Sequence, residues 1–156
     1  MSITVIDTEL DNFWMKTAYR IPDNECACVP AGSKPDKTRP IGRLDVRSFI
    51  TNLADQGKVK AGATAVRGIA FDGGHGIKEV ALSIDGGKTW KPTQLGRDLG
   101  KYSFRAWQTT VKLPAGAQTL MARATSRSGE VQPMEPRWNP AGYMRNVVET
   151  LHVEAA

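Results

Sequence analysis

Apolar and polar residues alternate with a period of two through most of the chain after Ile41, a pattern that predicts β-strands. The clearest run is 79–84, in which Val80, Leu82 and Ile84 share one face of the expected strand. In residues 66–71 both alternating sets are mostly apolar or small, which predicts a strand covered on both faces. Further strands are predicted at 44–50, 88–92, 104–113, 119–126 and 147–153.

Residues 1–40 show no such pattern. A short strand is expected at 3–6, and an apolar group follows at 13–15. Residues 30–40 are rich in proline, glycine, serine and lysine, and they predict an extended linker because each proline disfavours helix at the preceding residue. We therefore predict two parts, an irregular N-terminal extension at 1–40 and a β-domain at 41–156.

Neither part contains a long helical pattern, since no segment keeps a 3.6-residue apolar period beyond two turns. The 15 glycines and 9 prolines are spread along the chain and indicate frequent turns. About seven short strands separated by turn residues are typical of a β-sandwich. The Cys…Trp…Cys pattern of antibody domains is absent, so strand number and spacing carry the prediction. The predicted fold class is all-β, an immunoglobulin-like antiparallel β-sandwich with an irregular N-terminal extension.

Composition narrows the class of protein without defining a function. Hydrophobic residues make up 40% of the chain and charged residues 24%, values typical of a folded globular protein rather than a disordered one. No apolar run approaches the roughly 20 residues that span a bilayer, so no membrane association is predicted. Residues 1–5 lack the features of a secretory signal, which predicts a cytoplasmic protein if the chain is made as it stands.

The net charge of +5 is mild, and its densest stretch is 34–47. Prolines and aspartates interrupt the lysines and arginines there, and Phe49 is the only aromatic residue nearby. Nucleic-acid-binding proteins usually gather basic residues on one face together with stacking aromatics. The sequence therefore predicts no nucleic-acid partner, and it favours a solvated loop or one that faces an anionic small molecule or an acidic partner.

The two cysteines, Cys26 and Cys28, are separated by one alanine. An unstrained disulfide prefers Cα atoms about 4.4–6.8 Å apart with suitably directed side chains, and we expect the short spacing to prevent it. A zinc site usually needs four ligands, whereas the histidines, His75 and His152, are distant in sequence. Both cysteines are therefore predicted to be free or half-buried thiols in a connecting segment.

Residues 83–90 have the composition of a tight hairpin. Gly86 and Gly87 allow the positive φ angles of the turn, Asp85 can cap its backbone amides, and Trp90 can fold back over it. The string also resembles the Asp-box of sialidases and related β-proteins, where it recurs in several copies as a structural hairpin. A single copy is present here, and a sugar site needs convergent polar groups as well, so a structural role is favoured.

No set of residues in the sequence predicts a self-contained active site. The glycine-rich turn at 72–76 fits neither a P-loop nor a dinucleotide fingerprint, and its lone His75 is more typical of a solvated turn than of a catalytic base. Serines lie in strands or turns without a nucleophile elbow, and acidic residues occur singly. Binding or assembly is therefore the favoured functional class.

Three stretches in one order resemble a known family: 66–80, 83–90, and 138–142 with Asn146. Together they are similar to the C-terminal dimerisation domain of the sulfite oxidase family of molybdenum enzymes. The resemblance covers about 41–156. It implies an immunoglobulin-like domain that forms a homodimer and packs against a molybdenum-cofactor domain. Within the motifs, Trp138, Asn139 and Gly142 match the family, beside the hairpin residues Asp85, Gly86, Gly87 and Trp90.

The extension at 1–40 strengthens the resemblance. Residues 13–20 are similar to the last segment of the family's cofactor domain, just before its linker. This implies that Tyr19 lines the active site of the intact enzyme, and that the adjacent Arg20 binds substrate. Taken on its own residue chemistry, Tyr19 fits an amphipathic interface residue equally well.

The chain also departs from the family pattern. The cysteine ligand of molybdenum and nearly all pterin contacts belong to a preceding domain that is missing here. The resemblance therefore implies no cofactor in this chain, and molybdopterin–molybdenum in an intact parent that oxidises sulfite to sulfate, periplasmic in bacteria. As an isolated chain it is expected not to be catalytic. Where some relatives place an anion-binding arginine this chain has Ala141, for which Arg145 or Arg137 can substitute.

A second function from another class remains open at this point. The chain would then be a stand-alone immunoglobulin-like module that binds carbohydrate or protein ligands. Such a module needs exposed, coplanar aromatic side chains, and those that can supply them are Trp90, Trp107, Trp138 and Tyr143. Burial of the tryptophans would exclude this function.

Overall fold

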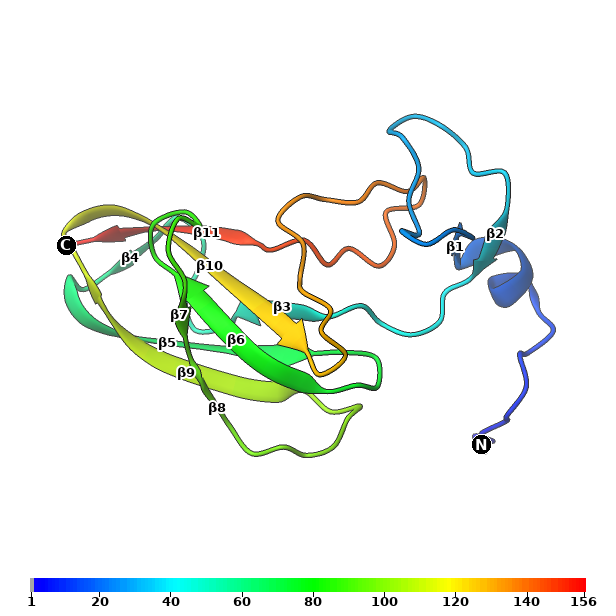
Figure 1. Ribbon diagram of the computed structural model, residues 1–156, viewed down its shortest axis with the longest axis horizontal. Coiled ribbons are helices and arrows are strands. Elements are labelled where there is room, and N and C mark those ends of the chain that lie inside the picture. Colours follow the sequence, from blue (N-terminus) through cyan, green and yellow to red (C-terminus); the bar gives the residue numbers. More distant parts are fainter. Residues whose placement is uncertain (1) are drawn as a thin grey trace. The chain divides into compact units, whose positions relative to one another are not determined.

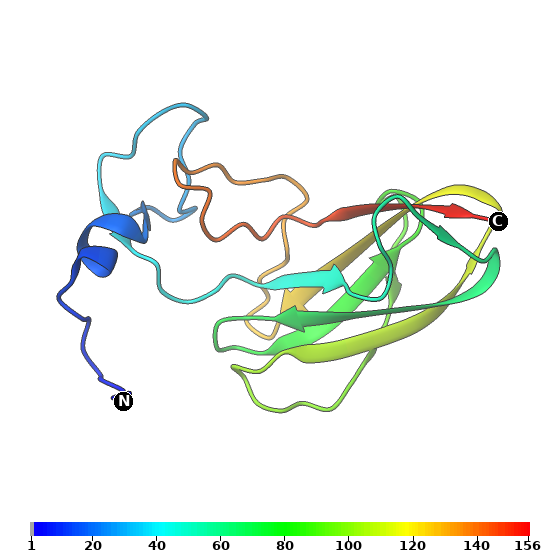
Figure 2. The same ribbon diagram turned by 180° about the vertical axis from the view of Figure 1, so that it is seen from behind.

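A computed structural model describes residues 2–156 (Figures 1 and 2). The chain divides into two compact units. The first, which we call the N-terminal unit, contains the residues up to Gly42 together with Pro136–Arg145. The second, which we call the sandwich unit, contains Arg43–Glu135 and Asn146–Ala156.

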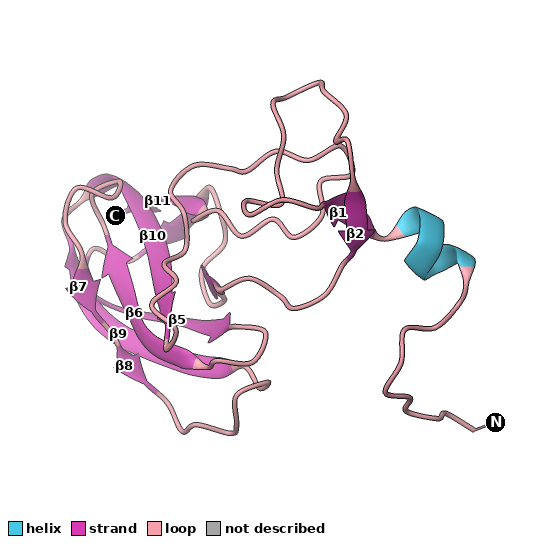
Figure 3. Cartoon of the chain, turned by 45° about the vertical axis from the view of Figure 1, so that its right-hand side comes forward, coloured by secondary structure: helices cyan, strands magenta, loops and turns pink. Residues whose placement is uncertain are grey.

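Strands dominate the sandwich unit, whereas the N-terminal unit consists mostly of loops, as the cartoon in Figure 3 shows. The N-terminal unit contains one short π-helical turn, η1, and a two-stranded sheet, β1-β2. The sandwich unit contains a five-stranded sheet, β4-β11-β10-β6-β7, and a four-stranded sheet, β3-β5-β9-β8. The elements in chain order are η1 Trp14–Ala18, β1 Arg20–Pro22, β2 Thr38–Pro40, β3 Arg47–Ile50, β4 Gly57–Val59, β5 Gly62–Phe71, β6 Ile77–Ser83, β7 Lys91–Pro92, β8 Gln94–Leu95, β9 Arg105–Leu113, β10 Gly116–Ser126 and β11 Thr150–Ala155.

The predicted all-β sandwich is confirmed. The named strand pairs are antiparallel, with the exception of the parallel pair β11–β4 at the edge of the larger sheet. Alternation along β5 places Val66, Gly68 and Ala70 in the interior, opposite Trp107 of β9. The interior is filled from both sheets by the buried side chains Val46, Val66, Ile77, Val80, Leu82, Trp107, Leu113, Leu120 and Val153.

A buried polar group lies inside this apolar core. The side chain of Gln132 is 1% exposed, and its Oε1 accepts hydrogen bonds from the amides of Ser48 at 2.9 Å and Ala124 at 3.2 Å. Its Nε2 donates to the carbonyl oxygens of Ser48 and Val147, each at 3.3 Å. The Ser48 hydroxyl in turn accepts a 2.9 Å bond from the indole N–H of Trp107. Gln132 thus joins β3, β10 and the segment that leads into β11.

Several local predictions are wrong. Residues 3–6 form no strand, and Ile3 is 93% exposed, because a single short apolar run without a pairing partner gains nothing from extended structure. The strand predicted at 44–50 is shorter, because β3 begins only at Arg47, and Leu44 before it is 51% exposed. Within the segment 30–40, which is predicted to be an extended linker, residues 38–40 form strand β2 and pair with β1, and the linker assignment itself stays a prediction. Within residues 2–156 there is no helix with the length and apolar character needed to span a membrane.

Candidate functional site

The hairpin after β6 is held by a closed set of polar contacts. The Asp85 carboxylate accepts hydrogen bonds from the Ser83 hydroxyl at 2.7 Å, the Thr89 hydroxyl at 2.6 Å and the Thr89 amide at 3.0 Å. The indole N–H of Trp90 donates to the Gly87 carbonyl at 3.0 Å, so the ring folds back over the turn. Gly86 and Gly87 have φ angles of 72° and 87°, which residues with a Cβ rarely adopt. These contacts are satisfied within the turn itself.

The same contacts change the pKa of the Asp85 carboxyl. The pKa of the Asp85 carboxyl lies well below its ordinary value, chiefly because the hydroxyl and the amide of Thr89 donate to the carboxylate, with a further contribution from Ser83. A group whose pKa is lower in the folded chain stabilises the fold above its unfolded pKa, and this contribution is lost as the pH falls towards the folded pKa.

We therefore expect acid to lower the thermal stability of the wild type more than that of a variant without the Asp85 carboxylate. Between pH 6 and pH 3 the thermal midpoint of the wild type should fall more than that of Asp85→Asn, whose neutral amide does not titrate. Circular dichroism melts of both proteins across this range measure the difference. The lowered pKa values of Asp55 and Asp98 act in both proteins and therefore cancel. Parallel pH profiles for the two proteins would contradict the role assigned to Asp85.

Tyr19, the predicted active-site residue, follows η1 in the N-terminal unit and is 46% exposed. Its ring centroid lies 5.7 Å from that of Trp14 and 5.5 Å from that of Tyr143. Phe13 extends the group with an edge-on contact to Trp14. The structure thus brings together an aromatic cluster, defined here as Phe13, Trp14, Tyr19 and Tyr143, from two segments distant in sequence. Sequence reasoning did not pair Tyr19 with Tyr143, because no local pattern signals a contact of such long range.

The segment that presents Tyr143 is a turn closed by Asn139. The Asn139 side chain donates to the Tyr143 carbonyl at 2.8 Å and accepts from the Tyr143 amide at 3.1 Å. Gly142 lies within this turn with a φ angle of 69° and donates its amide to the Asn139 carbonyl. The carbonyl of Trp138 accepts a 2.9 Å bond from the Val29 amide. The motif residues of this segment therefore shape the turn, and Ala141 lies exposed on it.

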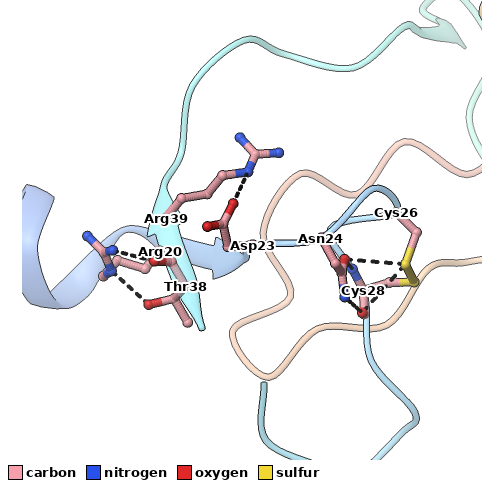
Figure 4. A network of polar contacts seen from close by, with 7 residues as sticks. All are labelled: Arg20, Asp23, Asn24, Cys26, Cys28, Thr38 and Arg39. Atoms are coloured by element: carbon pink, nitrogen blue, oxygen red, sulfur yellow. Dashed lines mark hydrogen bonds and ion pairs between the residues drawn. A yellow bond between two sulfur atoms is a disulfide. The ribbon is translucent and has the colours of Figure 1, made fainter. Parts of the chain in front are cut away.

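Arg20, the predicted substrate ligand, makes three hydrogen bonds: two to Thr38 across the β1–β2 pair (Figure 4) and one to Met15 of η1. Its guanidinium donates to the Thr38 hydroxyl at 2.9 Å, to the Thr38 carbonyl at 2.6 Å and to the Met15 carbonyl at 2.8 Å. These bonds fix the hairpin beside η1. Arg145 is exposed where the 136–145 segment ends, and Arg137 is exposed near its start. The substrate-binding roles of these arginines stay predictions.

The prediction of free thiols is wrong, because Cys26 and Cys28 form a disulfide (Figure 4). Their Cα atoms are 5.1 Å apart, inside the range that a disulfide accepts. The intervening Ala27 makes this possible by adopting a φ angle of +49°, the left-handed region, which tightens the chain between the cysteines. The short spacing therefore does not prevent the bond, because the separation of the two Cα atoms depends on the conformation of Ala27.

The described residues do not fit a resident metal centre. No three His, Cys, Asp or Glu side chains among residues 2–156 lie close enough together to hold a metal ion. Cys26 and Cys28 are bonded to each other and offer no thiolate.

Two of the aromatic residues considered for a carbohydrate-binding face have contacts in the structure. Trp107 is 2% exposed in the core, and the Trp90 ring lies 4.3 Å from the guanidinium carbon of Arg123. Burial of Trp107 also removes one of the aromatic side chains that a carbohydrate-binding face would need.

Comparison with known proteins agrees with this organisation. A model of the Mo-co oxidoreductase dimerisation domain matches residues 38–155. The mitochondrial sulfite oxidase of Homo sapiens is 30% identical over 162 residues, which cover 97% of this chain and 29% of that protein. The nitrate reductase [NADH] of Spinacia oleracea is 28% identical over 162 residues, 92% of this chain and 18% of that protein. The fold is also similar to that of a chain in the crystal structure of the sulfane dehydrogenase SoxCD from Paracoccus pantotrophus, with a TM-score of 0.74 and 21% sequence identity. The similarity covers 95% of this chain and 38% of the SoxCD chain.

The two packed sheets define an immunoglobulin-like β-sandwich domain. The chain belongs to the Mo-co oxidoreductase dimerisation domain family, within the sulfite oxidase-like molybdenum-cofactor oxidoreductases. Membership implies a part in dimer formation. The chain spans less than a third of the human sulfite oxidase that it matches.

Proposed function

We propose that this chain is the homodimerisation domain of a sulfite oxidase-like molybdenum oxidoreductase. The observation that carries the proposal is the family match over 38–155, which includes all the strands of the sandwich unit. The parent reaction that we infer is oxidation of sulfite to sulfate, since sulfite oxidases are among the most similar relatives. We expect the isolated chain to lack this activity, because the resemblance assigns the cysteine ligand of molybdenum to a preceding domain.

The outer face of the β3-β5-β9-β8 sheet supports pairing with a second copy. Phe49 and Phe71 meet edge-on with their ring centroids 6.4 Å apart, and Phe71 meets Phe104 in the same way at 5.4 Å. Phe104 is 60% exposed, and Ile69 lies opposite Phe49 on the same face. Because contiguous exposed apolar surface is costly in water, such a row is typical of a protein–protein contact.

The outer face of the other sheet differs in character. Its outward positions on β6, β10 and β11 are mostly charged or polar: Lys78, Glu79, Arg123, Thr125, His152 and Glu154. Charged residues are depleted at the centre of stable interfaces because their desolvation is unfavourable. The phenylalanine face, defined as Phe49, Ile69, Phe71 and Phe104, is therefore the side of the sandwich that we assign to the dimer.

A pair of matched variants tests this assignment. Phe104→Asp places a charge on the phenylalanine face, whereas Val131→Asp places the same charge on a half-exposed residue bridged to Thr125 of the other sheet. In sedimentation velocity at micromolar concentration, we expect the first variant to be monomeric and the second to remain dimeric. A dimeric Phe104→Asp variant, or a monomeric Val131→Asp variant, would place the interface elsewhere.

The N-terminal unit fits a second partner in the parent protein. The aromatic cluster exposes more than half of the Phe13 and Trp14 side chains, and Ile3, Val5, Ile6 and Leu10 before it are also exposed. We infer that this surface packs against the molybdenum-cofactor domain of the parent, with Tyr19 at the wall of its active site. Molybdopterin–molybdenum, which supplies the oxygen-transfer chemistry, would be held by that domain, since the residues described here do not form its ligand set.

A further inference from the structure

The Cys26–Cys28 disulfide lies in a loop of the N-terminal unit that is closed at its base. Strands β1 and β2 pair from Arg20–Pro40 to Pro22–Thr38, and the Asp23 amide then donates to the Lys37 carbonyl at 3.0 Å. The disulfide spans only Ala27 within this closed loop. It therefore joins two positions that the chain already holds close together, and it is not needed to close the loop.

This arrangement is poorly suited to a structural cross-link. The chain entropy that a disulfide removes from the unfolded state grows with the number of residues it encloses, and a three-residue ring removes little. In exchange, the ring holds Ala27 at φ +49°, where its Cβ crowds the backbone. Both cysteines are partly exposed, so that a reagent in solution can reach the sulfur atoms. Exposed disulfides of this kind are the ones that exchange readily.

The disulfide is connected by hydrogen bonds to the turn that carries Tyr143. The Asn24 side chain accepts from the Cys28 amide at 3.2 Å and donates to the Cys28 carbonyl at 2.8 Å. The next residue, Val29, donates its amide to the Trp138 carbonyl at 2.9 Å. Trp138 precedes Asn139, whose side chain brackets Tyr143 against Tyr19. The path from the sulfur atoms to the aromatic cluster is thus continuous and lies within the N-terminal unit.

We propose that Cys26–Cys28 is a thiol–disulfide exchange site for dithiol reductants, and that its reduction loosens the 136–145 segment. A thiolate of the dithiol attacks one cysteine sulfur, the Cys26–Cys28 bond breaks, and the other cysteine leaves as a thiolate. The second thiol of the reductant then attacks the mixed disulfide and releases the first cysteine. Two electrons and two protons pass to the pair, and the reductant becomes a disulfide.

The exchange itself is measured on the folded, full-length chain with dithiothreitol as the probe. We expect millimolar dithiothreitol to convert the wild type from zero to two maleimide-reactive thiols without denaturant. Cys26→Ser/Cys28→Ser should stay unlabelled throughout. A disulfide that resists dithiothreitol until the chain is unfolded would overturn the proposal.

Ala27 provides a sharper test of the reason for exchange. Ala27→Val places a β-branched residue at a left-handed position, which destabilises the closed ring more than the open one. The disulfide is titrated in mixtures of reduced and oxidised dithiothreitol. We expect half of it to be reduced at a ratio of reduced to oxidised dithiothreitol that is about tenfold lower in the variant than in the wild type. An unchanged or higher midpoint would show that the conformation of Ala27 does not favour opening.

Hydrogen exchange tests the connection to the 136–145 segment. After reduction, and equally in Cys26→Ser/Cys28→Ser, we expect amides of residues 28–30 and 136–145 to exchange at least several-fold faster. Amides of β6 should keep their rates and so show that the sandwich unit stays folded. Reduction that leaves 136–145 unchanged would overturn the proposed coupling. None of these readouts depends on dimerisation, so their failure and that of the dimer proposal are distinguishable.

Discussion

Truncating Gln132 to alanine is expected to lower the free energy of unfolding of the sandwich unit by about 3 kcal/mol. The change removes the acceptor of two buried amides, Ser48 and Ala124, and the donor to the carbonyls of Ser48 and Val147. A buried polar group left without a partner costs about 1–3 kcal/mol, and water cannot reach these groups without opening the core. Urea titration followed by circular dichroism measures the loss.

Gln118→Ala is the matched control for this experiment. Gln118 lies on β10, and its side chain is only partly buried and donates to the carbonyls of its own turn, Pro114 at 3.1 Å and Gly116 at 3.5 Å. We expect this variant to change the free energy of unfolding by less than about 0.5 kcal/mol. If Gln132→Ala and Gln118→Ala lose the same stability, the buried network does not hold the two sheets together.

Replacing Gly68 by alanine is expected to have a comparable or larger effect, above about 3 kcal/mol. A Cβ on Gly68 would lie 2.2 Å from the Phe49 carbonyl oxygen and 2.3 Å from a ring carbon of Trp107. The first is backbone of the neighbouring strand and the second belongs to a fully packed core residue, so neither can move without separating β3 from β5 or displacing the ring. Urea titration followed by circular dichroism measures the effect. We expect the variant to unfold at a lower urea concentration than the wild type or to give a low yield of folded protein.

Gly42→Ala serves as the control, because a Cβ there meets no atom within 4 Å and the residue has no positive φ angle. We expect it to unfold like the wild type. A Gly68→Ala protein with an unchanged midpoint would mean that β3 and β5 do not approach each other as closely as the structure places them.

The sandwich was predictable from the sequence because its strands are long enough to show alternation. The run Val80, Leu82 and Ile84 located β6 within two residues at its start and one at its end, and the prolines and glycines located the turns. Strands β4 and β8 were missed because two or three residues are too few for a period-two pattern. Gln132 lies between Val131 and Pro133 without any periodic signal, and only its contacts reveal it as a core residue.

The parts of the site that involve the N-terminal unit were less predictable. The prediction of free cysteines failed because the distance between residues two apart depends on the conformation of the residue between them, and Ala27 adopts one that alanine rarely takes. The motif residues Trp138, Asn139 and Gly142 were identified from the resemblance alone. Their physical role, a turn that presents Tyr143 to Tyr19, became visible only in the structure.

The mass of the wild-type chain in solution decides whether it forms a homodimer. Light scattering of the full-length protein at micromolar concentration, coupled to size exclusion, reports this mass without a label. We expect twice the chain mass of 17.0 kDa, because we propose that a second copy covers the phenylalanine face. A single species of 17.0 kDa that persists as the concentration is raised would contradict the assignment of this chain as a homodimerisation domain.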